Sequence, residues 1–387
     1  MTPLSTEQYE KISLQEKKHH TAVISIDGIG PSIFCSITKY LKLNRMSWED
    51  FWVNQDRVWS RIPLSQKIVK SINIFKKEHD IDSYWQMLKQ KHISVISDRE
   101  KHYPLLLKKT DDHPPILFVK GNINLCTNLP VAVIGTRRMT AYGKLVTSKI
   151  TAELVSHGAT IISGFMYGVD LQSQQVALES GGVTVGVLGF GFDHIFPRQQ
   201  QGLVKAMLKT NRVAFVSEYP PFVQPTRGTF PRRNRIIAGL SLAVVVTEAG
   251  PKSGTQITVG YALDYGRDVF AVSGPITSPY HEGVKHLLNQ GAMLVGSGQE
   301  IISNLSANNW VKVNEKVDSA SGQQLDLSAI STTPLQQKIL DALYVLPLTI
   351  QELSQQLEVS STEIMKTLTA LELRGLVIFQ ANQWVLS

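Results

Sequence analysis

The chain has 387 residues, of which 43% are hydrophobic and 18% charged, so it can bury the cores of two or three globular domains. Its two cysteines, Cys35 and Cys126, exclude a disulfide framework and a cysteine-based metal site, and they favour a reducing, cytoplasmic compartment. The formal net charge of +7 at pH 7 favours an anionic partner, and no apolar run approaches the roughly 18 residues of a membrane-spanning helix, so no membrane partner is expected.

Residues 1–112 are expected to form a small helical N-terminal domain. Within it, residues 22–34 predict a helix, a tight turn at Gly28 and Gly30, and a second helix. This pattern resembles a helix-hairpin-helix, in which glycine-freed backbone N–H groups can hold a phosphate without reading sequence. A plain packing turn between two helices explains the same pattern equally well. The run Ile93–Ile96, near the end of this region, is strand-like.

Short apolar runs alternate with helical segments from Val131 onward. The runs that predict buried strands cover residues 131–134, 160–162, 183–188, 213–216, 242–247, 269–273 and 293–295. Such alternation predicts crossover units that build a parallel sheet with helices on both faces. We therefore expect residues 113–305 to form a doubly wound α/β domain.

The C-terminal region reads as a linker followed by a small domain. Residues 306–331 are rich in Ser, Asn and Gln, which is typical of a linker. Residues 332–387 predict three helices and a hairpin, which is the pattern of a winged helix-turn-helix. Residues 334–387 hold three basic and five acidic residues, a net charge of −2. Because phosphate neutralisation supplies most duplex affinity, this charge favours a protein-contact role and leaves DNA binding as the alternative.

The stretch Phe230–Ser241 brings Arg232, Arg233 and Arg235 to the start of a predicted helix. Arginines near a helix N-terminus oppose the helix dipole, so they are poorly explained as stabilisers of that helix. Residues 219–247 contain no Asp or Glu and end in a predicted buried strand. The stretch therefore predicts an anion site, where backbone N–H groups and guanidinium groups face one ligand. A solvated basic loop is the alternative.

Four glycine-bearing loops follow predicted strands, at residues 135–138, 163–164, 189–191 and 250–255. In an open parallel sheet, ligands bind beyond the carboxyl ends of the strands. Glycines let the backbone approach a ligand, and Ser or Thr residues with free N–H groups can hold a phosphate. A single glycine is explained by a tight turn, but four such loops at one edge favour a phosphate-lined groove. The loops match neither the dinucleotide-binding fingerprint nor the nucleotide-binding P-loop.

Aromatic residues also gather in these loops. Those in or beside the loops are Phe165, Tyr167, Phe190, Phe192, Phe196, Tyr219, Phe222 and Phe230. Basic groups with exposed aromatic rings suit single-stranded nucleic acid, whose bases stack while its phosphates are neutralised. Some of these rings must belong to the core, and the pattern alone does not separate the two kinds.

Candidate catalytic groups are scarce. The ten histidines are scattered without metal-ligand spacing, so no metal site is expected. The acids closest to strand ends are Asp170, Asp193 and Glu218. For each of them a structural role, such as capping a helix or pairing with an arginine, is favoured over general acid or base chemistry.

Taken together, the strands and loops described above resemble those of the DprA/Smf family, the bacterial DNA-processing proteins of natural transformation. The matching blocks are residues 131–138, 163–170, 187–193, 217–221, 230–241, 248–255 and 266–272. The resemblance is dense over residues 100–300 and looser over the helical N-terminal and winged C-terminal domains. Gln174, Gln256 and Ser273 depart from the family's usual residues at the rim of its pocket.

The resemblance implies an extended Rossmann-like domain that forms a homodimer and binds single-stranded DNA in a basic pocket. It further implies that the protein protects the strand and loads the RecA recombinase, without catalysis and without a cofactor. The family's Gly-Ser-Arg block falls on Gly135, Thr136 and Arg137, its third-loop basic residue on Arg198, and its Arg-Asn-Arg block on Arg233, Asn234 and Arg235. The DNA-binding residues expected from the loops and the resemblance together are Gly135, Thr136, Arg137, Arg138, Ser163, Gly164, Phe192, Arg198, Phe230, Arg232, Arg233, Asn234, Arg235, Lys252, Ser253, Gly254 and Thr255.

An enzyme is the competing interpretation. The related nucleotide hydrolases of the lysine-decarboxylase-like family carry their catalytic Glu in a P-G-G-x-G-T-x-x-E motif. In this sequence that position is Thr258. A hydrolase would lack its acid here, so a binding protein is favoured over an enzyme.

Overall fold

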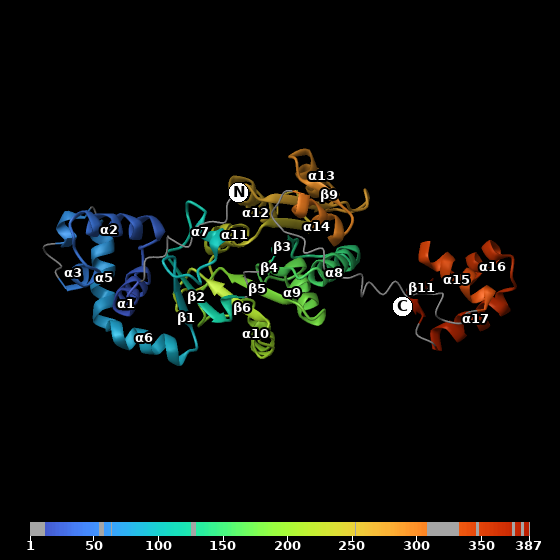
Figure 1. The fold of residues 1–387 in the computed structure, drawn as a ribbon, viewed down its shortest axis with the longest axis horizontal. Helices are drawn as coiled ribbons and strands as arrows, with labels where there is room; N and C mark the ends of the chain where they lie inside the picture. The colour runs from blue at the N-terminus through green and yellow to red at the C-terminus, as the bar shows by residue number, and fades with distance from the viewer. Residues whose placement is uncertain are drawn as a thin grey trace. The chain divides into compact units, whose positions relative to one another are not determined.

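The computed structural model of the chain describes residues 12–53, 58–62, 64–124, 129–251, 253–307, 333–345, 348–373, 376–380 and 383–386. The chain divides into two compact units between residues 312 and 313. The first unit contains the N-terminal helices and the large sheet, and the second contains the C-terminal helices and hairpin (Figure 1).

The N-terminal region is helical, as predicted. Its elements are α1 (Leu14–Ile24), α2 (Pro31–Leu43), α3 (Trp48–Val53), the 3-10 helix η1 (Trp59–Arg61), α5 (Gln66–Glu78) and α6 (Ile81–Gln90). The turn between α1 and α2 contains Gly28, whose φ of +87° lies in the region that only glycine adopts readily. Side chains such as Phe51 and Trp48 are buried among these helices, so they form a helical core.

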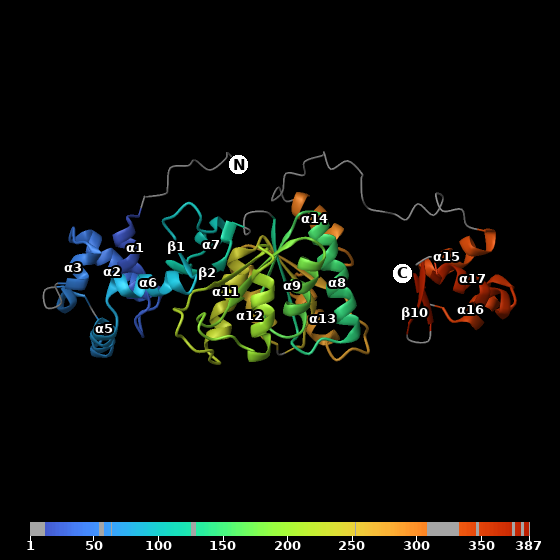
Figure 2. The same cartoon turned by 90° about the horizontal axis from the view of Figure 1, so that it is seen from below.

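A nine-stranded sheet forms the centre of the first unit (Figures 1 and 2). Its strands are β1 (Ser94–Ser97), β2 (Ile116–Gly121), β3 (Pro130–Gly135), β4 (Thr160–Ser163), β5 (Val183–Leu188), β6 (Val213–Ser217), β7 (Ala243–Glu248), β8 (Asp268–Val272) and β9 (Met293–Val295). The order across the sheet is β1-β2-β6-β5-β4-β3-β7-β8-β9, and the neighbours from β6 to β9 pair in parallel. Each of the seven apolar runs predicted as strands therefore forms one.

Two strands at one edge depart from the predicted parallel sheet. β2 pairs antiparallel with β6, and β1 pairs antiparallel with β2. β2 lies in a segment that had no strand prediction, and β1 precedes the expected domain boundary at residue 113. The sheet therefore begins at residue 94. The helix α14 (Gly298–Ala307) likewise extends past residue 305, so the predicted linker starts later than expected, and residues 308–331 lie outside the described residues.

Helices cover both faces of the sheet (Figure 2). One face packs against α8 (Ala141–Ser156), α9 (Val169–Glu179), α10 (Gln201–Leu208) and α14, and the other against α7 (Leu105–Lys108), α11 (Thr229–Leu240), α12 (Thr255–Asp264) and α13 (His281–Asn289). Alternation along the strands explains this arrangement, since Val131 and Val133 enter one core while Ala132 and Ile134 enter the other.

The N-terminal helices dock on the β1 side of the sheet through apolar contacts and ion pairs. One hydrophobic cluster contains residues of both regions, for example Phe34 and Phe215. Lys17 of α1 lies 2.8 Å from Glu100, and Arg99 lies 2.6 Å from Glu16. The two regions therefore share one core and form one compact unit.

The second unit has the predicted winged-helix arrangement. Its elements are α15 (Pro334–Val345), α16 (Ile350–Leu357), α17 (Ser361–Leu373), β10 (Val377–Gln380) and β11 (Gln383–Leu386). The two strands pair antiparallel, and Leu353, Ile364 and Leu368 are fully buried between the helices. At the start of α16, Thr349 and Glu352 form a reciprocal capping box. Across both units, no described helix is long and apolar enough to cross a membrane.

Candidate nucleic-acid interface

A pocket of about 390 Å³ opens at the carboxyl ends of β3 and β7. From β3 the chain builds the sheet in one direction through β4, β5 and β6, and it then returns to β7 and continues in the other direction. The pocket therefore lies at the topological switch point, where open α/β sheets bind their ligands. We call it the switch-point pocket. Nine of the predicted DNA-binding residues line it: Gly135, Thr136, Arg137, Arg138, Arg233, Asn234, Ser253, Gly254 and Thr255.

The loop between β3 and α8 is fixed from the neighbouring strand. The backbone N–H of Thr136 donates to the carbonyl of Glu248 over 2.7 Å. The Glu248 carboxylate accepts from the backbone N–H of Thr140 at 2.9 Å and from its hydroxyl at 2.7 Å. Gly168 passes so close beneath this loop that a Cβ there would lie 2.2 Å from the Thr136 carbonyl oxygen. The backbone of residues 135–138 is thus held in one position.

Arg137 and Arg138 project from this loop and are exposed. The guanidinium carbon of Arg137 lies 5.7 Å from the centre of the Phe230 ring, within the range of a cation–π contact. Phe230 is itself packed against Phe190 and Phe196. The ring therefore orients Arg137 at the mouth of the pocket without neutralising its charge.

The N-terminus of α12 forms the opposite wall. Gly254 is its N-cap and offers no side chain to the first-turn N–H groups. The Ser253 hydroxyl beside it is buried and has no hydrogen-bond partner among the described residues. A helix N-terminus with uncapped N–H groups attracts anions, and a free hydroxyl adds a donor. Lys252, also predicted here, lies outside the described residues.

Arg233 lies at the floor of the pocket and is only 3% exposed. Its Nη1 donates to the carbonyl of Gly164 at 2.6 Å and also to the carbonyl of Val187. Burial lowers the pKa of Arg233 to about 10, against the attraction of the nearby Asp170 carboxylate. Arg233 thus ties the ends of β4 and β5 to α11, and this bracing role replaces the predicted direct contact with a strand.

Asp170, in the first turn of α9, is the acidic member of the same pocket. Burial raises the pKa of its carboxyl to about 6, while Arg233 and Arg137 pull in the opposite direction. Asp170 was predicted to have a structural role, helix capping or arginine pairing. Its position directly after the glycine-bearing loop that follows β4 was the available signal that it also faces a ligand site.

Arg235 and Arg232 face away from the switch-point pocket. Arg235 is 4% exposed and lies 2.5 Å from the Glu218 carboxylate, so its contacts are those of a buried ion pair, and its predicted contact with DNA stays a prediction. The Arg232 side chain is 46% exposed and lies 3.7 Å from the same carboxylate. All three arginines lie within α11, which begins at Thr229. Their directions alternate because successive residues of a helix point to different sides.

Four other predicted residues lie outside the switch-point pocket. Ser163 is fully buried and donates to the Val133 carbonyl, so it belongs to the sheet. A Cβ at Gly164 would lie 2.6 Å from the Asp170 carboxylate, so this glycine makes room for that side chain. Phe192 is 7% exposed beneath Lys120, so its ring packs in the core, and its predicted contact with DNA stays a prediction. Arg198 is exposed at the start of the short helix η3 (Arg198–Gln200).

Neither a metal centre nor the hydrolase acid is found in the described part of the chain. No group of three or more His, Cys, Asp or Glu residues there could hold a metal ion. Thr258, at the position of the hydrolase glutamate, is buried in α12 and lines the switch-point pocket. Its hydroxyl has no carboxylate's basicity, so Thr258 cannot take the role of that glutamate.

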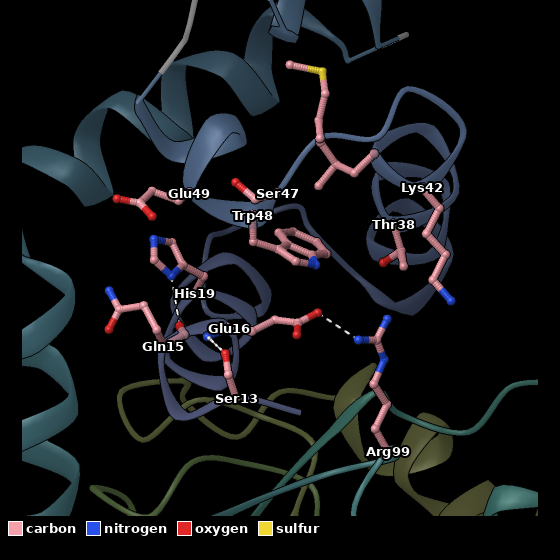
Figure 3. Close-up of a pocket in the computed structure, with 12 residues that line it drawn as sticks. Ser13, Gln15, Glu16, His19, Thr38, Lys42, Ser47, Trp48, Glu49 and Arg99 are labelled. Carbon is pink, nitrogen blue, oxygen red and sulfur yellow. Dashed lines mark hydrogen bonds and ion pairs between the residues drawn. The ribbon is translucent and has the colours of Figure 1, made fainter. Parts of the chain in front are cut away.

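A further pocket, of about 380 Å³, lies among α1, α2 and α3 (Figure 3). Arg99 reaches into it from the sheet and meets Glu16, while His19 bonds the Gln15 carbonyl. The contact between Arg99 and Glu16 thus joins the N-terminal helices to the sheet. Its residues were not predicted as a site, and its contacts indicate a structural joint.

Comparison with known proteins identifies the family. Residues 94–306 match the model of DNA recombination-mediator protein A, and residues 323–379 match the DprA winged helix domain. The chain belongs to the DNA recombination-mediator protein A family. The predicted DprA/Smf resemblance is thereby confirmed, and the start of the match at residue 94 coincides with β1.

Individual proteins of this family are similar in sequence to the chain. The chain is 39% identical to the DNA processing protein DprA of Bacillus subtilis over 57% of this chain and 74% of that protein. It is 40% identical to the protein Smf of Escherichia coli over 58% of this chain, but this covers only 60% of Smf.

Solved structures of the same family share the fold. DNA processing protein A of Streptococcus pneumoniae superimposes with a TM-score of 0.64 at 29% identity, over 76% of this chain and 98% of that one. A second structure, of the Helicobacter pylori protein, addresses the single-stranded DNA binding mode of that protein. It superimposes with a TM-score of 0.50 at 29% identity, over 56% of this chain and 96% of that one.

Proposed function

We propose that the chain binds single-stranded DNA at the switch-point pocket and acts as a binding protein without catalysis. The observation that carries this proposal is the exposed pair Arg137 and Arg138 facing the uncapped N-terminus of α12 across one pocket. Guanidinium groups and backbone N–H groups are the donors that hold phosphates. The single-stranded DNA binding of the Helicobacter pylori relative supports the same ligand.

The residues around the site favour a single strand over a duplex. Exposed rings lie in the adjoining loops at Tyr167 and Phe196. Exposed aromatic rings stack on unpaired bases, whereas the bases of a duplex are already stacked. We therefore expect the phosphates to follow the arginines and some bases to rest on these rings.

We further propose the biological role that the family membership suggests. In this role the protein coats and protects a strand that enters during natural transformation, and it loads the RecA recombinase on that strand in the cytoplasm. It acts as a homodimer joined through the Rossmann-like domain. Light scattering of the purified chain tests the dimer, and RecA filament formation on a protected strand, with and without the chain, tests the loading.

Binding of single-stranded and duplex DNA over a salt series tests the core of the proposal. We expect tighter binding of the single strand and a steep loss of affinity with salt, because each neutralised phosphate contributes a slope of about −0.7. Replacing Arg137 by Ala should cost about 1–3 kcal/mol and flatten the slope. Arg61→Ala, which removes the same charge from an exposed position in the N-terminal region, is the matched control. Equal effects of the two variants would contradict the site.

A further inference from the structure

A second pocket lies where the N-terminal helices meet the sheet, and we call it the interdomain pocket. Its volume is about 540 Å³, which is within the usual range for small-ligand sites. Three segments form its walls: the α1–α2 turn at residues 24–31, the approach to β2 at residues 114–116, and the loop after β6 at residues 218–223. Arg232 of α11 completes it.

A buried carboxylate in this pocket has an oxygen without a partner. Glu218 is 7% exposed, and its Oε2 accepts from Arg235 at 2.5 Å. The other oxygen, Oε1, is buried and has no hydrogen-bond partner in the described part of the chain. Leaving a buried acceptor unpaired is costly, especially when the group is charged. An N–H donor from a ligand would satisfy this oxygen.

The remaining walls suit a flat, aromatic ligand. Tyr219, Phe222, Ile26 and Ile29 all line the pocket. Phe222 is 40% exposed, and its ring lies parallel to that of His79, with a centroid distance of 6.4 Å. A ring held in this way is a ready stacking surface for a second ring on its free side.

The pocket also has a place for an anion. The Arg232 side chain is 46% exposed, and its Nη2 lies 3.2 Å from the position that a Cβ on Gly30 would take. Gly30 is the N-cap of the thirteen-residue helix α2 and provides no capping side chain. Arg232 therefore lies at the positive end of a helix, an arrangement that a phosphate would stabilise.

We propose that the interdomain pocket is a nucleobase site that prefers bases with an exocyclic amine, cytosine above all, over thymine. The amine would donate to Oε1 of Glu218, as carboxylates accept from the N4 amine of cytosine. The base would rest on Phe222, and its phosphate would meet Arg232. Thymine offers carbonyl oxygens where cytosine offers the amine, so it would place an acceptor against the carboxylate.

This inference rests on the proposed function in one respect, namely that the base comes from the bound strand. α11 lines both pockets, with Arg232 in the interdomain pocket and Arg233 and Asn234 in the switch-point pocket. A strand that occupies both pockets would therefore pass over the start of α11. A free nucleotide offers the same chemistry, and the experiment separates the two sources.

Binding of oligo(dC) and oligo(dT) of equal length to the full chain tests the preference. We expect the wild type to favour oligo(dC) by about tenfold, the value of one hydrogen bond to a charged group. Phe222→Ala and Glu218→Gln should each reduce this ratio toward one. Phe222 is exposed, so its replacement keeps the test valid even if Glu218→Gln unfolds the chain. Leu43→Ala, which alters an exposed apolar residue of α2 outside both pockets, should keep the ratio.

Two further measurements distinguish a base of the bound strand from a free nucleotide, and the nucleobase site from the strand binding proposed at the switch-point pocket. Crosslinking of 5-iododeoxycytidine within an oligonucleotide to Tyr219 or Phe222 supports a strand base, and saturable binding of dCMP that Phe222→Ala abolishes supports a free nucleotide. Arg137→Ala should weaken both oligonucleotides equally, so a failure of the switch-point pocket changes total affinity but not the ratio. A wild-type ratio near one together with no dCMP binding would overturn the nucleobase site, as would a ratio that both pocket variants leave unchanged.

Discussion

The guanidinium of Arg235 lies 2.5 Å from Oε2 of Glu218, and both side chains are more than nine-tenths buried. Asp112 adds a second carboxylate at 3.6 Å from Nε of Arg235. Burial raises the pKa of Glu218, although Arg235 and Arg232 oppose the shift. The contact joins α11 to the end of β6, and it explains why an arginine can occupy the first turns of this helix without a DNA phosphate.

Replacing Arg235 by Ala should therefore destabilise the fold more than it weakens DNA binding. Removing one partner of a buried ion pair leaves the other charge unpaired and costs about 3–5 kcal/mol. Arg232→Ala, which removes a half-exposed arginine from the same carboxylate, should cost less than about 1 kcal/mol. Urea denaturation of the two variants measures the difference. Equal unfolding midpoints, with a selective loss of strand affinity in Arg235→Ala, would return Arg235 to the DNA-binding set.

The contact between Arg137 and Phe230 should be visible as an energetic coupling. Phe230→Ala removes the ring that orients the guanidinium at 5.7 Å, so strand affinity should fall even if the ring touches no base. The single variants should not add, and a double-mutant cycle should give a coupling of about 0.5–1 kcal/mol. Fluorescence anisotropy with a labelled oligonucleotide measures all four proteins. Strict additivity would mean that the two side chains act independently.

The sequence was sufficient for those parts of the fold that local pattern determines. Each parallel strand came from a short apolar run, and the loop at residues 135–138 was placed at the pocket because the carboxyl ends of parallel strands meet at one edge. β2 had no strand prediction because its run follows two prolines in what reads as a connector. β1 was strand-like, but only its partner β2 shows that it belongs to the sheet.

The direction of each arginine could not be predicted in the same way. Arg232, Arg233 and Arg235 share one acid-free segment, yet Arg232 and Arg235 lie near the Glu218 carboxylate while Arg233 bonds backbone carbonyls beneath the switch-point pocket. Their acceptors, the Val187 carbonyl and the Glu218 carboxylate, are distant in sequence and approach only in the folded sheet. Composition therefore indicated a basic surface, whereas long-range packing decides which charges remain available to a ligand.

Asp170 should make strand binding depend on pH. With a pKa of about 6, its carboxyl takes up a proton as the pH falls from 7.5 to 5, and a negative charge facing Arg137 and Arg233 is lost. Affinity for an anionic strand should then rise by about fivefold, the effect of one partly screened charge. The Asp170→Asn variant should bind the strand more tightly at pH 7.5 and should not show this rise in affinity as the pH falls. The Gly164 and Val187 carbonyls still hold Arg233 in that variant. The difference between the two proteins at each pH is the measured quantity, and parallel profiles would exclude Asp170.

A negative charge placed at Gly254 should test the anion site without disturbing the fold. An added Cβ at Gly254 would meet no atom within 4 Å, and Asp is a good N-cap, so Gly254→Asp should leave the free energy of unfolding unchanged or raise it slightly. The new carboxylate would face the pocket and repel a phosphate, so strand affinity should fall at least about tenfold at low salt and recover partly as salt screens the charge. Gly260→Asp introduces the same charge in the same helix, also with no atom within 4 Å of the added Cβ, and serves as the control. Equal losses in the two variants would show that general repulsion, not a phosphate at the start of α12, accounts for the effect.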